Sequence, residues 1–374
     1  MTSPYNKKQI LIIGGGMAGA ILAKDLANSH KVTLVDPNDY FEVPMAAPRS
    51  LVTPEFSEAA IIPFAKALPN VEVIRGALRD FDGVNSVITQ HDGVLVNLQA
   101  DVTVLATGSQ FPNCLMRAFD STSTQRSSFY SQFKSQLVKA TKILIVGGGP
   151  IGIELAGEIT DHYPNKSITI LECGNRILSG TTKEASDFAK SILESRGVNI
   201  YCNERIDAPK DNTVNLFDPV GEVVTTGGKI DYDLLIWCVG GKPNTSYMKE
   251  KLSGVLNAKG QICVTPQLRV KGMVKVFALG DITDLDENKM AWHIAGQIKV
   301  ASFNINQVLK DHASDSDLKI YKPKTNNPMM AVSIGANSGV LHLPVIGLIK
   351  TPWMVKLAKS GTMLVPKYRK ILGV

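Results

Sequence analysis

Two stretches of the sequence share one pattern, QILIIGGGMAG at residues 9–19 and KILIVGGGPIG at residues 142–152. Each stretch begins with a run rich in isoleucine, leucine and valine, which predicts a buried β-strand. Each run leads into the spacing G-x-G-x-x-G, whose glycines allow a tight turn, a close approach of backbone to a pyrophosphate and close helix packing. The repeat therefore predicts two strand–turn–helix units that each bind a dinucleotide.

An acidic residue completes each unit. Asp36 lies 22 residues after Gly14, and Glu172 lies 25 residues after Gly147, each at the end of a further apolar run. A carboxylate about 20 residues after the first glycine accepts hydrogen bonds from a nucleotide ribose. A single glycine pattern also occurs in ordinary tight turns, but two copies that each keep the acid favour two nucleotide sites.

In each unit, the free N–H groups and the positive dipole end of the following helix are expected to face the pyrophosphate. The glycines assigned to the two pyrophosphates are Gly14, Gly16, Gly19, Gly147, Gly149 and Gly152. Three later strands end in glycine turns, where the chain can pass from one nucleotide unit to the next. The candidate cofactor residues at these turns are Ala106, Thr107, Gly108, Gly240, Gly280 and Asp281. Asp281 either grips a polyol hydroxyl of a cofactor or caps a helix.

The composition favours a folded protein of a reducing compartment. The chain has 374 residues, 44% of them hydrophobic, which is enough for two or three domains. The five cysteines form no C-x-x-C pair, which argues against a disulfide reductase with a dithiol beside its flavin. The N-terminus lacks the pattern of a signal peptide, and no apolar run reaches the roughly 18 residues of a membrane span. We therefore expect a cytoplasmic protein.

The net charge of +6 is concentrated near the C-terminus. Residues 318–374 contain nine basic and no acidic side chains, whereas the other 317 residues carry 31 basic and 34 acidic ones. This asymmetry indicates a local anionic partner and not general nucleic-acid binding. After two expected strands, at 329–334 and 339–343, residues 344–359 mix large apolar side chains with lysines in short helical turns. This segment is either a lid on the body or a lid that also contacts an anionic membrane or lipid-droplet surface.

Several motifs together resemble the pyridine nucleotide–disulfide reductase superfamily in its two-dinucleotide form. They are residues 147–159, residues 277–284, the helix expected at 290–304, residues 321–323 and the Lys359-Ser360 region. Over about residues 9–370 the chain is most similar to the apoptosis-inducing-factor-homologous, ferroptosis-suppressor type of NAD(P)H:quinone oxidoreductase. It is similar, more distantly, to type II NADH dehydrogenases. Some members carry a myristoylated glycine at position 2, where this chain has threonine.

The resemblance implies that the first unit binds FAD and the second binds NADH or NADPH, which passes a hydride to the flavin. It implies that Asp281 holds the flavin ribitol and that Arg49 lies against the flavin nucleotide; the alternative for Arg49 is a surface ion pair. It puts Glu154 near the nicotinamide; the alternative is a helix-surface carboxylate. The carboxylate of Glu172 would repel a 2′-phosphate and so favour NADH, a preference that Arg176 would soften.

The expected fold class is α/β, with two Rossmann-like domains arranged as in glutathione reductase. Residues 1–108 and 241–308 form the FAD domain, residues 109–240 form the NAD(P)H domain, and residues 309–374 form a small α+β module. In this arrangement the helix that begins near Ala291 points its N-terminus at the flavin, where its dipole would stabilise the anionic reduced form, so Ala291 is a further candidate cofactor residue.

The resemblance also suggests catalytic candidates. Related reductases line the acceptor site at the positions of Trp292 and Gln297, and Glu154 is the third candidate. Trp292 in the core is the alternative, and His293 is expected to be a packed or solvated side chain and not a proton donor. Hydride transfer between the two cofactors needs no catalytic acid or base from the protein.

Three functions are weighed. The first is a membrane-surface NADH:quinone reductase with a lipophilic quinone as acceptor. The second is a soluble reductase that passes electrons to an acidic ferredoxin or rubredoxin docked on the basic tail. The third is a redox-sensing signalling flavoprotein. Intact patterns at both glycine turns argue against loss of catalysis.

Overall fold

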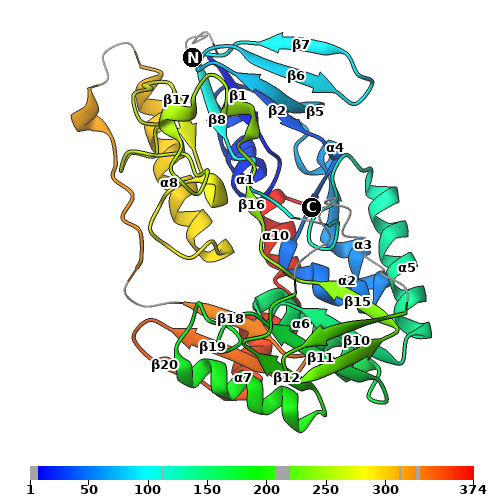
Figure 1. Cartoon of the computed structure of the whole chain (residues 1–374). Helices are drawn as coiled ribbons and strands as arrows, with labels where there is room; N and C mark the ends of the chain where they lie inside the picture. Colours follow the sequence, from blue (N-terminus) through cyan, green and yellow to red (C-terminus); the bar gives the residue numbers. More distant parts are fainter. Residues whose placement is uncertain (1–6, 112, 207–219, 311–313, 326–328) are drawn as a thin grey trace.

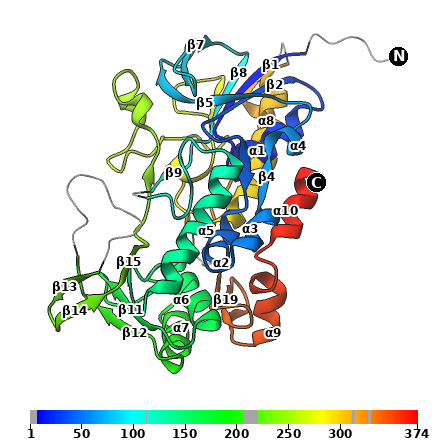
Figure 2. The same cartoon turned by 90° about the vertical axis from the view of Figure 1, so that its right-hand side faces the viewer.

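The computed structural model describes residues 7–111, 113–206, 220–310, 314–325 and 329–374. Two largely separate sheets lie at opposite ends of the molecule, and the chain passes from one to the other and back (Figures 1 and 2). Helix α2 (Ala47–Val52) lies between the two ends and packs on helices α5 (Ser123–Lys139) and α6 (Pro150–His162).

The first sheet has seven strands in the order β17-β8-β1-β2-β5-β6-β7. The strands are β1 (Gln9–Ile13), β2 (Lys31–Asp36), β5 (Glu72–Phe81), β6 (Ser86–Gln90), β7 (Leu95–Leu98), β8 (Val102–Leu105) and β17 (Val276–Ala278). The first five in spatial order are parallel, and β5, β6 and β7 form an antiparallel meander. Helices α1 (Met17–Leu26) and α8 (Ala291–Val308) pack on each other beside this sheet and share one apolar core with it.

The second sheet has four parallel strands in the order β12-β11-β10-β15. The strands are β10 (Lys142–Val146), β11 (Ser167–Glu172), β12 (Asn199–Cys202) and β15 (Leu234–Trp237). Helices α5, α6 and α7 (Lys183–Ser195) share a core with it, and the hairpin β13 (Gly221–Thr225) and β14 (Gly228–Tyr232) borders a second, smaller cluster. Helices and parallel strands alternate here because a parallel pair needs a crossover connection.

The C-terminal module begins with the antiparallel strands β18 (Met330–Ser333), β19 (Gly339–Leu343) and β20 (Gly347–Ile349). Helix α9 (Pro352–Val355), one wider π-helical turn (Lys356–Ser360) and helix α10 (Val365–Leu372) follow. The two expected strands are confirmed. The segment 344–359 differs from the prediction of helical turns alone: the left-handed backbone of Gly347 turns the chain back, so that Leu341 and Ile349 pair.

Short elements join these parts. They are β3 (Tyr40–Glu42), β4 (Ile61–Pro63), β9 (Ser109–Gln110), β16 (Lys242–Pro243), α3 (Ser57–Ala60) and α4 (Phe64–Ala67). The α/β fold with two nucleotide-type sheets confirms the predicted fold class. The division into 1–108 with 241–308, 109–240 and 309–374 stays a prediction.

Candidate functional site

The first glycine turn connects β1 to α1 and has no room for side chains at its key positions. Gly14 has a left-handed φ of +104°, and a Cβ atom there would lie 2.3 Å from the carbonyl oxygen of Ala106. A Cβ atom on Gly19 would lie 1.8 Å from the carbonyl oxygen of Gly14. Gly16 is the N-cap of α1, so the N–H groups of the first helical turn face the space above it.

The second turn, between β10 and α6, repeats this geometry. Gly147 has φ +114°, and a Cβ atom there would lie 2.6 Å from the carbonyl oxygen of Cys238. A Cβ atom on Gly152 would lie 2.1 Å from the carbonyl oxygen of Gly147. Gly149 is the N-cap of α6, and a Cβ atom there would meet nothing within 4 Å. Both turns thus have the shape of a pyrophosphate cradle in front of a helix N-terminus.

The two acids of the repeat occupy equivalent positions. Asp36 is fully buried and accepts a hydrogen bond of 2.6 Å from the N–H group of Gly15. Glu172 accepts hydrogen bonds of 2.7 Å from the N–H groups of Gly148 and Gly174. Each carboxylate therefore stands at the end of its second strand, directly beside the glycine turn.

A cation that the sequence pattern did not predict joins the first turn. The guanidinium of Arg117 lies 2.5 Å from Asp36, and it is the nearest group to the position that a Cβ atom on Gly16 would occupy. A single arginine in an irregular segment carries no pattern, so sequence reasoning had no signal for this contact.

The Gly-Asp turn after β17 lies close to the first unit. Gly280 has φ +80°, and a Cβ atom there would lie 3.8 Å from the side chain of Ala18 in α1. The hydroxyl of Ser109 donates a hydrogen bond of 3.2 Å to Asp281. Burial raises the pKa of Asp281, while the hydrogen bond from Ser109 and the charges of Lys289 and Arg117 lower it by less.

The chain passes from the first sheet toward the second just after β8, at the candidate cofactor residues Ala106, Thr107 and Gly108. The hydroxyl of Thr107 donates a hydrogen bond of 2.7 Å to the carbonyl oxygen of Asn244, whose N–H group donates to the carbonyl oxygen of Gly108 at 2.9 Å. Ala106 is buried and closes the floor of the first turn. A Cβ atom on Gly240 would meet no atom within 4 Å, so the chain there is open to the surface.

The side-chain amide of Gln297 is buried and forms two hydrogen bonds. Its amide oxygen accepts a hydrogen bond of 2.8 Å from the N–H group of Gly280, and its amide nitrogen donates at 2.8 Å to Glu287. The hydroxyl of Tyr321 also donates to Glu287, at 2.8 and 2.9 Å, and His293 lies 3.3 Å from the same carboxylate. His293 is therefore a packed side chain, as expected.

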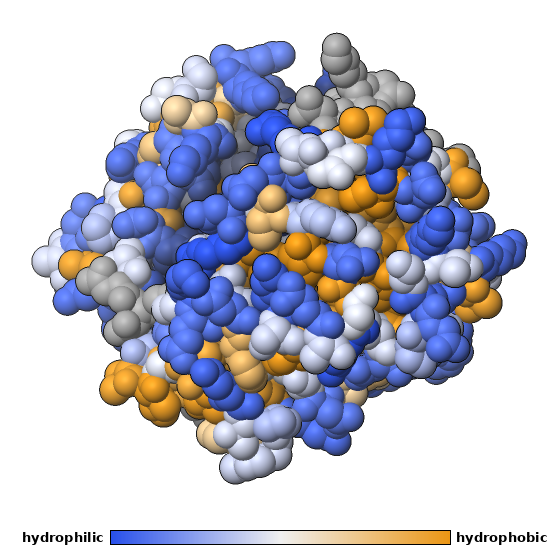
Figure 3. Space-filling model, turned by 60° about the horizontal axis from the view of Figure 1, so that its bottom comes forward, coloured by the Kyte–Doolittle hydropathy of each residue, from blue (hydrophilic) through white to orange (hydrophobic). Residues whose placement is uncertain are grey.

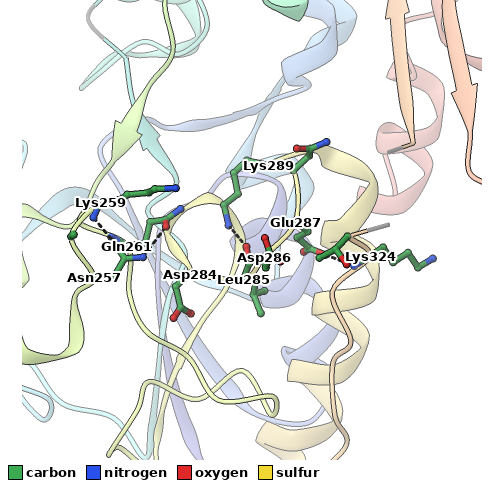
Figure 4. A pocket seen from close by; sticks show the side chains of 12 residues that line it. Asn257, Lys259, Gln261, Asp284, Leu285, Asp286, Glu287, Lys289 and Lys324 are labelled. Carbon is green, nitrogen blue, oxygen red and sulfur yellow. Dashed lines mark hydrogen bonds between the residues drawn. The ribbon is translucent and has the colours of Figure 1, made fainter. Parts of the chain in front are cut away.

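A polar hollow of about 470 Å³ lies beside this network (Figure 4). Its wall includes Glu287 and Lys289, whose ammonium donates to the carbonyl oxygens of Thr283 and Leu285. The glycine turns contribute nothing to its lining, so this hollow is distinct from the two nucleotide cradles.

Trp292, the other acceptor candidate, is 48% exposed and so is not a core residue. It follows Ala291, the first residue of α8, and the ammonium of Lys324 lies 5.9 Å from the centre of its ring. That Trp292 contacts an acceptor stays a prediction.

Glu154 is buried in α6 and forms an ion pair with Lys359 of the C-terminal module. Lys359 also donates a hydrogen bond of 2.9 Å to the carbonyl oxygen of Ala331, and the N–H group of Ser333 donates to Glu154 at 3.1 Å. The alternative of a helix-surface carboxylate is excluded. The Lys359 region matched the family pattern, but the pairing itself spans 205 residues and was not predicted.

Arg49 forms an ion pair, but the pair is buried and so differs from the surface ion pair that was the alternative to contact with a flavin nucleotide. Its guanidinium lies 2.8 Å from Glu158 in α6 and donates at 3.2 Å to the carbonyl oxygen of Gly361. Arg49 thus joins α2, α6 and the C-terminal module. Arg176 donates to the carbonyl oxygens of Ser179 and Thr181.

The thiols offer no redox pair. All five cysteines are free, and burial raises the pKa of Cys238 to about 12, so its thiol stays protonated at neutral pH. Within the described ranges, no three His, Cys, Asp or Glu side chains are grouped as metal ligands.

Two glycine cradles with matching acids, on two separate sheets, point to one family. The family model described as "Pyridine nucleotide-disulphide oxidoreductase" matches residues 8–301. The chain belongs to that family. Such oxidoreductases combine a flavin with a nicotinamide nucleotide, and the two cradles offer a site for each.

Relatives of known sequence align with nearly the whole chain. Apoptosis-inducing factor homolog B of Dictyostelium discoideum is 30% identical over 98% of this chain and 97% of its own length. Ferroptosis suppressor protein 1 of Homo sapiens is 28% identical over 95% of this chain and 93% of its own length. The predicted resemblance is confirmed.

Solved structures share the fold at low identity. A sulfide:quinone oxidoreductase from Aquifex aeolicus has a TM-score of 0.74 and 15% identity, and the match covers 98% of this chain and 92% of the other. NDH2 from Plasmodium falciparum, solved in complex with NADH, has a TM-score of 0.72 and 16% identity, over 98% and 95% of the two chains.

Proposed function

We propose that this oxidoreductase binds FAD on the β1–α1 turn and NADH on the β10–α6 turn, and that it reduces a lipophilic quinone. The observation that carries the proposal is the duplicated cradle, in which Asp36 and Glu172 each accept a hydrogen bond from the glycine turn in front of a helix N-terminus. The flavin would supply the redox chemistry, taking two electrons from the nicotinamide nucleotide and giving them to the acceptor.

The first cradle fits a dinucleotide flavin. The required glycines Gly14 and Gly19 bring α1 close to the strand, and Asp36 stands beside the turn where a ribose would lie. Asp281 lies in the Gly-Asp turn after β17, close to α1, where it accepts a hydrogen bond from the hydroxyl of Ser109 and would hold a polyol chain. FAD has both a ribose and a polyol chain, so these residues fit it.

The second cradle favours NADH over NADPH. Glu172 is fixed by the two backbone N–H groups of Gly148 and Gly174, and a fixed carboxylate beside the ribose repels a 2′-phosphate. Arg176 keeps its positive charge while it donates to two carbonyl oxygens, and we expect it to soften this preference. Glu154 and Lys359 lie behind the same turn, where they would orient the nicotinamide and keep water out of the space between the cofactors.

The surface of the C-terminal module supports a lipophilic acceptor. Figure 3 views the end of the molecule that carries this module and shows apolar side chains gathered among hydrophilic ones. Val345, Ile346, Trp353 and Leu357 are between 65% and 96% exposed. Because residues 318–374 carry nine basic and no acidic side chains, this face suits peripheral contact with an anionic membrane or lipid droplet, where quinones reside. Among the described residues, no helix has the length and apolarity needed to cross a membrane.

One observation favours a second candidate, the reduction of an acidic protein carrier. The same basic tail would attract such a carrier, and a ferredoxin reductase from Rhodopseudomonas palustris shares the fold with a TM-score of 0.65 over 84% of this chain. The exposed apolar side chains favour quinone reduction at a membrane over reduction of a protein carrier. An acidic carrier would dock through charge, and such a docking site does not need exposed apolar side chains.

The test is a turnover assay on the purified, flavin-loaded protein. NADH oxidation is measured with a short-chain ubiquinone, with and without vesicles containing anionic lipid. Turnover that rises with the vesicles is the expected result. Bleaching of the flavin by NADH without quinone turnover would contradict the quinone proposal and leave the carrier. Failure of NADH to reduce the flavin would contradict both.

A further inference from the structure

Arg117 has an unusual electrostatic position. Its guanidinium lies 2.5 Å from Asp36, and a Cβ atom on Gly16 would stand 3.0 Å from its Nη1 atom. Gly16 is the N-cap of α1, so this cation faces the positive end of the helix dipole. A cation is disfavoured there, whereas an anion between the cation and the helix is stabilised by both.

The backbone that carries Arg117 is fixed beside the cradle. The side-chain amide of Asn38 donates a hydrogen bond of 3.1 Å to the carbonyl oxygen of Ala118, and its oxygen accepts one of 2.9 Å from the N–H group of Ser121. Ala118 itself is buried. Since Asn38 follows β2 by two residues, the segment is attached to the same strand end that presents Asp36. The approach of Arg117 is thus set by the fold and not only by its side chain.

The guanidinium acts on two carboxylates of the site. It pairs with Asp36, and its positive charge also lowers the pKa of Asp281, by less than burial raises it. The side chain remains 31% exposed, so it is open to a ligand that enters the cradle. A planar guanidinium can keep one N–H group on a carboxylate and direct others to phosphate oxygens.

We infer that Arg117 binds the diphosphate of the dinucleotide flavin, with Asp36 holding the guanidinium above the glycine turn. This rests on the proposed function, because it needs a dinucleotide at the β1–α1 turn. The diphosphate would lie between Arg117 and the N-terminus of α1, which removes the unfavourable contact of cation and dipole. Arg117 would then distinguish dinucleotide flavins from flavins that lack the diphosphate.

The test measures the affinity of the apo-protein for FAD by the quenching of flavin fluorescence, which does not depend on turnover. In Arg117→Ala, we expect the dissociation constant for FAD to rise about 10- to 100-fold, as for loss of a charge-assisted hydrogen-bonded contact. Arg117→Lys should be intermediate, since lysine keeps the charge but not the fork. The matched control is Arg79→Ala, which removes an exposed arginine from β5 of the same sheet.

The salt dependence gives a second readout. The difference between wild type and Arg117→Ala should shrink as ionic strength rises, whereas a difference caused by altered folding should not. An unchanged or tighter dissociation constant in Arg117→Ala would overturn the inference, because Arg117 would then only cover Asp36. If the wild-type apo-protein does not bind FAD at all, the proposed function fails together with the inference, and the two failures are thereby distinguished.

Discussion

Glu154 of helix α6 and Lys359 of the C-terminal module form a buried ion pair, although 205 residues separate them in the sequence. The N–H group of Ser333 and the carbonyl oxygen of Ala331 complete the surroundings of the pair. The charge of a residue in the helix after the second glycine turn is therefore balanced by a segment that lies outside the two large sheets. This pair couples the docking of the module to the electrostatics of the site.

Removing one partner of this pair should destabilise the protein. Lys359→Met leaves the Glu154 carboxylate buried without its cation, and we expect a loss of about 3–5 kcal/mol in the free energy of unfolding. Urea denaturation measures this. Glu154→Gln combined with Lys359→Met should restore much of the stability but not the turnover. Lys350→Met, which breaks an exposed pair with Glu184, is the control and should cost no more than about 1 kcal/mol. If Lys359→Met and the control Lys350→Met lower the free energy of unfolding equally, the prediction is contradicted.

Neutralising Glu172 should change the nucleotide preference. Glu172→Gln keeps an oxygen for the N–H group of Gly148 but removes the charge that faces a 2′-phosphate. We expect the ratio of kcat/KM for NADPH to that for NADH to rise about tenfold, the factor that corresponds to ~1.4 kcal/mol. Glu184→Gln, at the exposed start of α7, should leave the ratio unchanged. A fall in both kcat/KM values with a constant ratio would mean that Glu172 only supports the turn.

Because of Asp281, the apo-protein should be less stable at neutral pH than at acidic pH. Burial raises the pKa of this carboxyl in the folded state. A carboxyl with a raised pKa binds more protons in the folded than in the unfolded state, so stability is lost as the pH rises through the folded pKa. Asp281→Asn should therefore raise the Tm of the apo-protein at pH 7, with the difference vanishing below about pH 4, while it weakens FAD binding. A Tm difference that is constant from pH 4 to pH 7 would refute this explanation.

The exposed apolar side chains of the C-terminal module should govern binding to vesicles. Ile346→Ser combined with Leu357→Ser removes two of them, and we expect the partition coefficient onto phosphatidylserine-containing vesicles to fall about tenfold or more. Flotation on a density gradient measures this. Val84→Ser, at an exposed valine near the first sheet, is the control. If neither variant changes flotation, the module acts only as a lid.

The backbone of the site could be predicted from the sequence, because its requirements are local. A strand that enters a helix through a tight turn needs glycine at Gly14 and Gly147, and the spacing of these residues is visible in eleven letters of sequence. The acids also follow from local order, since Asp36 and Glu172 end the strands next to those turns.

The side-chain pairings could not be predicted in this way. Arg117 reaches Asp36 across 81 residues, and Arg49 meets Glu158 across 109. Such contacts depend on how separate elements pack, and no periodicity in the chain reports that packing. Gln297 shows the same limit. The sequence predicted its position on α8, but it did not predict the hydrogen bonds of its side chain with Gly280 and Glu287.

Helix α10 returns from the C-terminal module to the first sheet, where Met363, Val365, Tyr368 and Leu372 belong to the same apolar core as α1. The ring of Tyr368 lies 6.3 Å from that of Phe41, and Lys24 of α1 donates to the carbonyl oxygen of Leu372. Residues 348 positions apart in the sequence thus share one interior. The core beside the first glycine turn is complete only once α10 has been made and has packed against α1, so a cofactor of that turn would be acquired after this segment has left the ribosome.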